Sequence, residues 1–240
     1  MISEPALVVC GHGTKDPEGR AAVAALVVEV AALLPGVTVR EAYVDVHGPA
    51  VADVVASVPR VPGPGPAGVV VPALLAAGYH VRVDLADAVR ERPDVVVAPA
   101  LGPDDRLVDV LLDRMSEAGI PDGADVLLAP AGSSDGSARA DGAEVARRLG
   151  ERWGAPVGLA FAAGAEPAVA ESVARAVEAG RTVAVVSYLL ARGHFQRRLE
   201  GCGAHVVTAP LLPDPRVAEV VVDRYRSVVA RAGSGPADGP

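Results

Sequence analysis

Histidine and aspartate residues follow three apolar segments of the N-terminal half in a pattern that suits metal chemistry. His12 stands in a Gly-His-Gly-Thr run after the first segment. Asp45 and His47 follow the second segment, and His80 follows the third in the order Gly-Tyr-His. Imidazole is the commonest side-chain ligand for divalent transition metals, and a nearby carboxylate completes a mixed nitrogen and oxygen site. Each residue alone has a structural alternative, as a loop, capping or surface residue, and His47 is left open between ligand and surface.

The elements that must position these residues follow from the hydrophobic pattern. We predict strands at 6–10, 37–44, 68–74 and 95–98, and helices at 18–34, 49–58, 85–92 and 104–118. Uninterrupted apolar strands separated by helices indicate a parallel sheet covered on both faces. Ligands bind such sheets at the carboxyl ends of the strands. The pattern therefore brings His12, Asp45 and His80 to one rim.

The second half of the chain repeats the first in the same order. Ala-Glu-Pro at 165–167 matches His-Gly-Pro at 47–49, and Arg-Gly at 192–193 matches Ala-Gly at 77–78. An offset of roughly 110–120 residues that holds over several landmarks indicates an internal duplication. The predicted fold class is α/β, with two similar three-layer α/β/α lobes, each built on a mostly parallel four-stranded sheet. We place the lobes at residues 1–119 and 120–232, and expect a disordered tail at 233–240.

The second copy lacks the three candidate ligands. Ala131 stands at the place of His12, Ala163 at that of Asp45 and Phe195 at that of His80. His194 is displaced to the position that matches Tyr79. A structural role gives no reason to lose all three residues while the scaffold persists, so we place the metal site in the N-terminal half.

Composition excludes several function classes. The formal net charge of −8 argues against nucleic acid as a partner. The longest apolar stretch, 69–79, is broken by Pro72 and Gly78 and is too short to cross a bilayer. The start of the chain lacks the features of a signal peptide, so the cytoplasm is expected. Cys10 and Cys202 form neither a disulfide framework nor a CxxC site, and we expect two buried small side chains.

Three motifs resemble those of the sirohydrochlorin chelatases of the CbiX/SirB type. The run from Leu7 to Asp16 is similar to their opening Gly-His-Gly-Ser-Arg motif. The run from Tyr43 to Pro49 is similar to their second motif, in which an acidic residue precedes a proline. The run from Val71 to Val81 resembles their third motif, in which Gly-Tyr/His-His-Val carries a ligand. Asp45 stands where many members have glutamate, and Thr-Lys replaces Ser-Arg at 14–15.

The resemblance implies two lobes around a cleft that holds a tetrapyrrole, the small-molecule partner, with one active half. The expected activity is insertion of Co2+ or Fe2+ into sirohydrochlorin, in cobalamin or siroheme synthesis, and the same ligands accept Ni2+. The ion is a substrate, no organic cofactor is expected, and a chain with both lobes is expected to be a monomer. His12 and His80 would hold the ion, and Asp45 could ligate it or accept protons.

The substrate's carboxylates need local positive charge in this acidic chain. The helix after Gly13-Thr14 is expected to aim free backbone N–H groups at the cleft. The candidate cationic partners are Lys15, Arg20, Arg82 and Arg192.

Two other functions remain open at the level of sequence. A carrier of metal or tetrapyrrole would use the same ligands without turnover. A histidine phosphatase also places His-Gly after its first strand, but it normally has arginine before the histidine, where this chain has Gly11.

Overall fold

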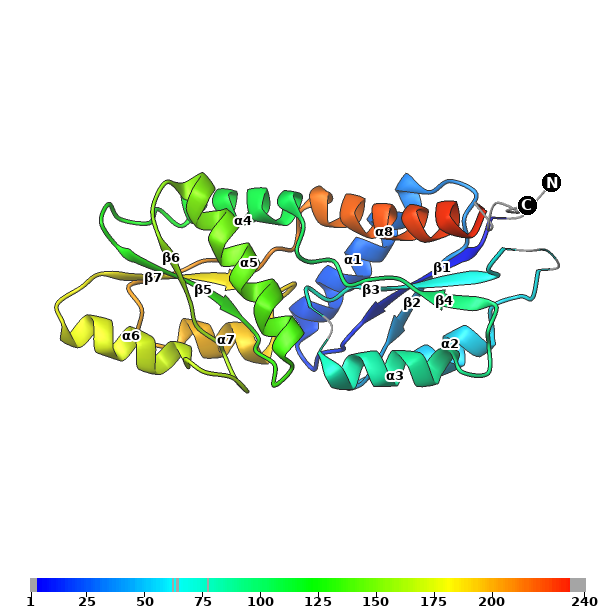
Figure 1. The fold of residues 1–240 in the computed structure, drawn as a ribbon, viewed down its shortest axis with the longest axis horizontal. Coiled ribbons are helices and arrows are strands. Elements are labelled where there is room, and N and C mark those ends of the chain that lie inside the picture. Colours follow the sequence, from blue (N-terminus) through cyan, green and yellow to red (C-terminus); the bar gives the residue numbers. More distant parts are fainter. Residues whose placement is uncertain (1–3, 62, 64, 77, 234–240) are drawn as a thin grey trace, which may run out of the picture.

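The computed structural model describes residues 4–61, 63, 65–76 and 78–233, without the side chains of residues 79–81. Two α/β lobes lie side by side along the long axis of the molecule (Figure 1). None of the helices in the described part of the chain is long and apolar enough to cross a membrane.

The first half of the chain alternates strands and helices throughout. Its elements are β1 (Ala6–Gly11), α1 (Pro17–Leu33), β2 (Val39–Tyr43), α2 (Val51–Ala56), β3 (Gly68–Pro72), α3 (Tyr79–Val89), β4 (Val95–Val97) and α4 (Asp105–Glu117). The four strands form one parallel sheet in the order β2-β1-β3-β4.

The second half repeats this order of elements. They are β5 (Asp125–Pro130), α5 (Gly136–Trp153), β6 (Val157–Leu159), α6 (Val169–Glu178), β7 (Val183–Tyr188), α7 (His194–Glu200), β8 (Val206–Val207) and α8 (Pro215–Gly233). The second sheet has the equivalent order β6-β5-β7-β8 and is also parallel. The prediction of two similar α/β lobes, each with a four-stranded parallel sheet, is confirmed.

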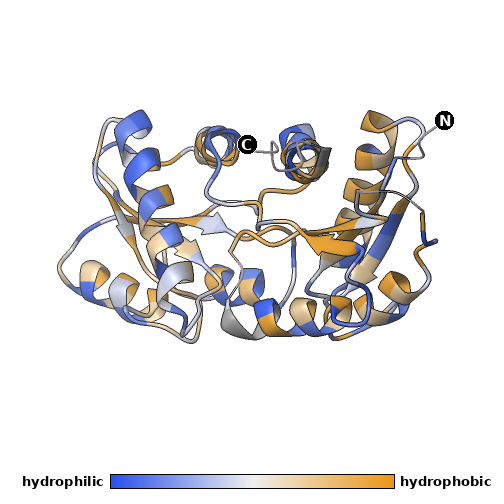
Figure 2. Cartoon of the chain, turned by 45° about the vertical axis from the view of Figure 1, so that its right-hand side comes forward, coloured by the Kyte–Doolittle hydropathy of each residue, from blue (hydrophilic) through white to orange (hydrophobic). Residues whose placement is uncertain are grey.

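The central strands are apolar on both faces because helices cover both. All six residues of β1 and all five of β3 are buried. Figure 2 shows orange strand segments between layers of helices that carry both blue and orange residues. Burial of β-branched side chains on both faces explains why the strands read as continuous apolar runs rather than alternating ones.

The last helix of each half packs against the other half. Helix α4 contacts helix α5 and strand β7 of the second half, whereas α8 contacts helix α1 and strand β3 of the first half. Figure 1 shows α4 over the second sheet and α8 over the first. The Tyr225 hydroxyl on α8 donates to the Pro5 carbonyl at 2.7 Å. The predicted division at residue 119 therefore separates the two copies of the sequence repeat, but each copy packs its last helix against the other half.

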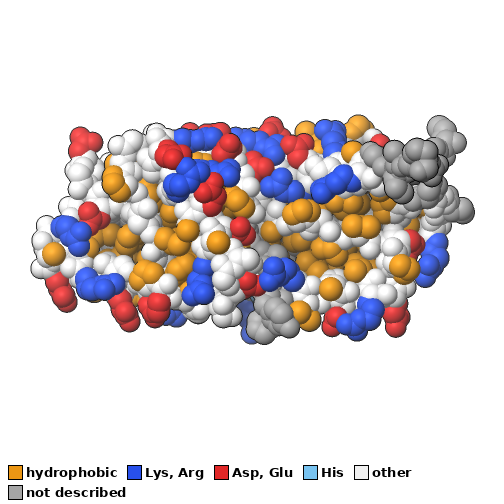
Figure 3. All heavy atoms as spheres, viewed as in Figure 1, with side chains coloured by type: hydrophobic (Ala, Val, Ile, Leu, Met, Phe, Trp, Pro, Cys, Tyr) orange, Lys and Arg blue, Asp and Glu red, His pale blue; other side chains and the backbone are white. Residues whose placement is uncertain are grey.

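Ion pairs connect the two helices, α4 and α8, that pack across the halves. Arg106 on α4 pairs with Asp223 on α8 at 2.6 Å, and Arg216 on α8 pairs with Asp113 on α4 at 2.5 Å. A second group joins α4 to α5, where Arg148 lies 3.1 Å from Asp105. Figure 3 shows basic and acidic side chains next to one another along the upper edge, over α4, α5 and α8.

Helix α3 begins earlier and ends earlier than the predicted helix at 85–92. It starts directly after Gly78, so His80 lies in its first turn rather than in a loop. It ends at Val89, four residues before Pro93. Beyond the helix, the Arg92 side chain is 6% exposed and donates to the Val55 carbonyl at 2.7 Å and to Asp94. Of the predicted tail at 233–240, Gly233 ends α8 and the rest lies outside the described residues.

Candidate active site between the lobes

One cavity of about 800 Å3 lies between the two halves and is lined by both. The first half contributes the loop after β1, with His12, and the segment after β3, with Leu74. The second half contributes the equivalent segments, with Ala131 and Leu190. The cavity therefore lies at the carboxyl ends of the strands, where a parallel sheet binds ligands.

The loop after β1 presents His12 to the cavity. Strand β1 ends at the buried Gly11, and the next residue, His12, is exposed. The His12 carbonyl accepts a hydrogen bond from the Asp45 amide at 3.0 Å, which joins the loops after β1 and β2. Gly13 has a φ of +101°, and a Cβ built on it would lie 2.0 Å from the Asp45 carbonyl oxygen. The joined loops leave no room for a side chain at position 13.

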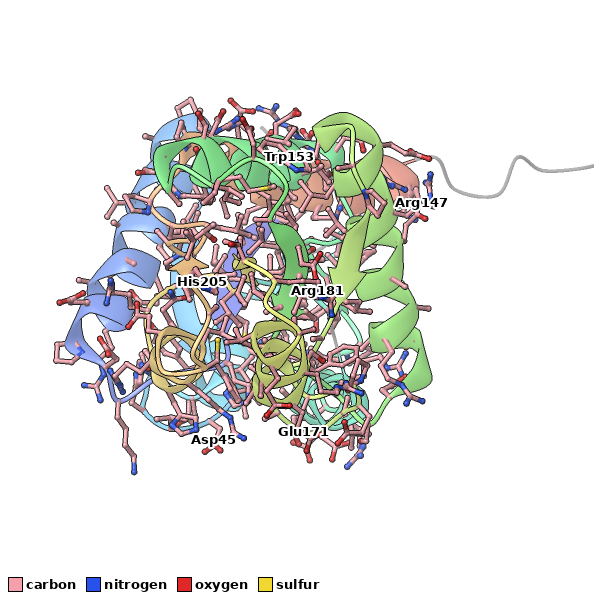
Figure 4. All side chains as sticks on the ribbon, turned by 90° about the vertical axis from the view of Figure 1, so that its left-hand side faces the viewer. Asp45, Arg147, Trp153, Glu171, Arg181 and His205 are labelled. Carbon is pink, nitrogen blue, oxygen red and sulfur yellow. The ribbon has the colours of Figure 1, made fainter. Side chains whose placement is uncertain are left out.

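Asp45 lies beside His12 in the backbone but not on the cavity wall. Its carboxylate is exposed and accepts a hydrogen bond from the Val46 amide at 2.6 Å. Figure 4 shows Asp45 at the lower edge of the molecule. Among the described residues that line the cavity, this loop is represented by Val46. The Asp45 side chain is therefore not brought to the cavity wall with His12 in this structure.

His80 belongs to the first turn of α3, and its side chain lies outside the described residues. Gly78, which precedes the helix, lines the cavity. Phe195, the corresponding second residue of α7, also lines it. Among the described His, Cys, Asp and Glu side chains, no group of three is arranged to hold a metal ion.

The ring of His47 packs against Tyr43, with 3.9 Å between the ring centroids. Its Nδ1 lies 3.0 Å from the Gly48 carbonyl oxygen, and its Nε2 is buried without a hydrogen-bond partner in the described structure. Burial raises the pKa of Tyr43, whose hydroxyl donates to Glu41. His47 is thus part of the packing beneath the second loop and does not line the cavity within the described residues.

The second half keeps the loop geometry of the first but lacks its candidate ligands. The Ala131 carbonyl accepts from the Ala163 amide at 2.9 Å, as the His12 carbonyl accepts from that of Asp45. Gly132 has a φ of +104°, close to that of its counterpart Gly13. His194 does line the cavity, and its ring centroid lies 5.4 Å from that of Phe195. These backbone contacts support the pairing of positions that the sequence repeat indicates.

Cationic side chains lie at one side of the cavity. Lys15 and Arg192 line it, and Lys15 has no ion pair within the described structure. Arg20 and Arg82 do not line it: Arg20 donates to the Thr14 carbonyl at 2.8 Å, and Arg82 pairs with an aspartate of the other half. Arg197 also lines the cavity and was missed by sequence reasoning. The repeat offered a signal for it, because position 197 matches position 82.

Two equivalent ion pairs connect the lobes. Arg197 on α7 pairs with Asp16 before α1, and Arg82 on α3 pairs with Asp135 before α5. Each aspartate also caps its helix; Asp16 accepts from the Glu18 and Gly19 amides at 3.0 and 3.2 Å. These backbone bonds and the arginine lower the pKa of Asp16.

The capping by Asp16 corrects one expectation from the sequence. The first backbone N–H groups of α1 were expected to be free for substrate carboxylates. They are instead bonded to Asp16, whose charge also opposes an incoming carboxylate.

The cysteines carry no metal chemistry in this arrangement. Cys10 is fully buried, and burial raises the pKa of its thiol to about 12. Cys202 is half-buried rather than buried, and neither forms a disulfide. Burial therefore disfavours the thiolate form of Cys10 near neutral pH.

Comparison with known proteins assigns the chain to a family. The profile of the family described as CbiX matches residues 6–118 and again residues 125–228. A sirohydrochlorin ferrochelatase from Priestia megaterium is 28% identical over 141 residues, which are 55% of this chain and 53% of that protein. The match thus spans about half the length of this curated relative.

Two solved structures share the whole architecture. SirB from Bacillus subtilis with Fe3+ has a TM-score of 0.79 and 22% identity, over 97% of this chain and 98% of that chain. The sirohydrochlorin chelatase SirB from Bacillus subtilis subspecies spizizenii, in complex with cobalt, has a TM-score of 0.76 and 19% identity over the same shares. At these identities the likeness establishes the fold.

Proposed function

The chain belongs to the CbiX family, and on this basis we propose that it is a chelatase that inserts Fe2+ or Co2+ into sirohydrochlorin. The observation that carries the proposal is the cavity of about 800 Å3 at the strand ends, lined from both halves with His12 on its wall. A site between two lobes suits a flat macrocycle, because each lobe can contact one face.

The ion enters as a substrate and must be held without being trapped. We assign this task to His12 and His80, because neutral imidazoles bind Fe2+ and Co2+ less tightly than thiolates would. His12 is exposed at the cavity wall. The place of His80 is supported by Phe195, which occupies the same helix position in the other half and lines the cavity.

Insertion exchanges two pyrrole N–H protons for the metal ion, so bases are needed. Asp45 is exposed and attached through its backbone to the His12 carbonyl. A rotamer change brings its carboxylate toward the ion or toward the ring, where it can accept a proton. We assign Asp45 to proton transfer and to auxiliary ligation.

The carboxylates of the tetrapyrrole are assigned to the cationic side of the cavity. Lys15, Arg192 and Arg197 line it. The residue of the second half that corresponds to Lys15 in the repeat is Ser134, which also lines the cavity but carries no charge. The charge of the cavity is therefore uneven, which favours one orientation of the substrate. Because both lobes are in one chain, we propose that a monomer is active.

The test is a metal-insertion assay with the full chain, followed by the absorbance change of sirohydrochlorin with Fe2+ or Co2+ at matched free metal. His12→Ala and His80→Ala should each lower the rate at least about 100-fold, as expected when a group essential to the reacting centre is lost. Circular dichroism should show an unchanged fold, because both residues follow the apolar runs that build the core, and His12 is exposed.

Multiple turnovers by the wild-type protein separate a chelatase from a carrier, which would stop at one equivalent. Wild-type rates in the His12→Ala protein would remove that histidine from the mechanism. Failure of the wild-type protein to insert either metal would refute the proposed function.

A further inference from the structure

Two large apolar side chains project into the cavity from opposite halves of the chain. Val46, in the loop after β2, is 40% exposed, and Phe195, in α7, is 38% exposed. Both line the cavity between the lobes. Exposed apolar side chains that line one cavity from two sides offer contacts for an apolar ligand.

Val46 is held in an unfavourable backbone conformation. Its φ is +72°, the one positive value among the described residues other than glycine. A β-branched residue in this region is an outlier, so the backbone at Val46 is strained. The corresponding residue of the second half is Gly164, with a φ of +66°. The two halves thus share the turn, but the first half places a valine where glycine would be free of strain.

Phe195 is held in place by its neighbour. Gln196 is 2% exposed, accepts from the Ser187 hydroxyl at 2.6 Å and donates to the Thr208 carbonyl at 3.1 Å. Thr208 in turn accepts from the Ser187 amide at 2.9 Å. This buried network anchors the first turn of α7, a helix of seven residues that is too short to be stable alone.

The network is particular to the second half. At the places of Ser187 and Thr208, the first half has Pro72 and Ala98, which lack side-chain hydrogen-bonding groups. In the second half, which lacks the candidate ligands, buried hydrogen bonds therefore hold the turn that carries the exposed Phe195 ring. That ring stands where the first half carries His80.

We propose that Val46 and Phe195 are the positioning residues that hold the apolar faces of the tetrapyrrole, one from each lobe. This inference rests on the proposed function and names the side chains that orient its substrate. A macrocycle has apolar faces and a carboxylate rim, so apolar contacts on the faces complement the cations at the cavity side. In this arrangement Val46 sits one residue from Asp45, and its contact fixes the distance of the ring from the ligand loop.

The arrangement explains why strain is kept at position 46. Glycine there would relieve the backbone but remove the apolar contact, so stability and substrate binding would change in opposite directions. If the valine were kept for folding alone, Val46→Gly would lower stability and leave substrate binding unchanged.

The test measures binding and stability separately in the full-length protein. Metal-free sirohydrochlorin is titrated into the protein without metal, and binding is followed by its fluorescence. Phe195→Ala should weaken binding about 10- to 100-fold, as expected for losing the burial of one aromatic ring. Phe195→Leu should keep part of the affinity. In turnover assays, KM for the tetrapyrrole should rise with a smaller change in kcat.

Val46→Gly and Val46→Asn both relieve the strain, because asparagine tolerates positive φ. Each should weaken tetrapyrrole binding about three- to ten-fold, because a small apolar contact is lost. Each should leave the thermal midpoint unchanged or higher by about 2–4 °C.

Matched controls come from the same chain. Trp153 on α5 is 37% exposed and is absent from the described lining of the cavity, and Figure 4 shows it at the upper edge of the molecule. Trp153→Ala should leave binding unchanged. Gly164→Val creates the strained valine in the second half and should lower the thermal midpoint without changing tetrapyrrole affinity.

Wild-type affinity in Phe195→Ala, or a fall in thermal midpoint without a loss of affinity in Val46→Gly, would overturn the inference. A wild-type protein that binds sirohydrochlorin but inserts no metal would refute the proposed function alone, and the binding titrations would still decide the roles of Val46 and Phe195. A wild-type protein that does not bind sirohydrochlorin would overturn both.

Discussion

Substituting Gly13 by alanine should separate the metal site from the stability of the fold. The new Cβ would lie 2.0 Å from the Asp45 carbonyl oxygen, whereas ordinary contacts begin at 3.4 Å. The loops after β1 and β2 must therefore move apart by about 1 Å or more, while a metal site tolerates shifts of only about 0.2 Å in its ligand distances. His12 and Asp45, the proposed ligands, flank this contact, so metal binding should be lost.

The cost in stability can be estimated from the same geometry. A non-glycine residue at a φ of +101° adds backbone strain of about 1–3 kcal/mol, and the overlap adds a further 1–3 kcal/mol or so. A total of about 2–6 kcal/mol lowers the thermal midpoint by about 4–24 °C and leaves a typical chain of this size folded.

Gly132→Ala is the matched control in the second half. Its φ is +104°, and its Cβ would lie 1.7 Å from the Ala163 carbonyl oxygen, so it should lower the thermal midpoint at least as much. Calorimetry gives the stability of both variants, and titration with Co2+ gives their metal binding. Gly13→Ala should lose the bound ion, and Gly132→Ala should keep it. Equal loss of metal binding in both variants would refute a site confined to the first half.

Three further predictions follow from the site. Asp45→Ala should slow insertion about ten- to 100-fold, whereas Asp45→Glu should keep most of the rate; equal wild-type rates for both would exclude a role for the carboxylate. His194→Ala should leave one bound Co2+ per chain by titration calorimetry, and the disappearance of a second ion would reveal a ligand set in the second half. Asp16→Asn keeps the helix cap but removes the charge that pairs with Arg197. The pKa of Asp16 is lowered in the folded protein, so its contribution is present above the carboxylate's ordinary pKa and is lost as the pH falls through the lowered value. The thermal midpoint of Asp16→Asn should therefore lie below that of the wild type at pH 7 and converge with it below about pH 4; a constant difference across this range would refute the ionic contribution.

The sequence determined the architecture because the hydrophobic pattern reflects local rules. Short, β-branched apolar runs such as 6–10 favour strands buried on both faces, and the glycines and prolines between runs end the elements. The internal duplication repeats this pattern, and comparison of the two copies shows that the first has His12 where the second has Ala131. The same comparison predicted that Ala131 and Ala163 replace the ligands, and the equivalent loop hydrogen bonds support that pairing.

Boundaries that depend on capping were less accessible to the sequence. The start of α3 at Tyr79 follows Gly78, which packs close to Ser133 of the other half, where a Cβ would lie 2.9 Å from its hydroxyl oxygen. A contact between residues so distant in the chain leaves no trace in local periodicity. The ion pair between Asp16 and Arg197 also joins residues far apart in the chain, so local periodicity does not predict it.

Only the tertiary structure decided how the two halves share their parts. The exchange of α4 and α8 depends on which sheet each amphipathic face meets, and two similar sheets give the sequence no means to choose between them. The cavity wall was decided in the same way: Lys15 and Arg192 line it, whereas Arg20 and Arg82 are bound elsewhere. The strain at Val46 also required coordinates, because residue types alone do not specify a backbone dihedral that the surrounding contacts impose.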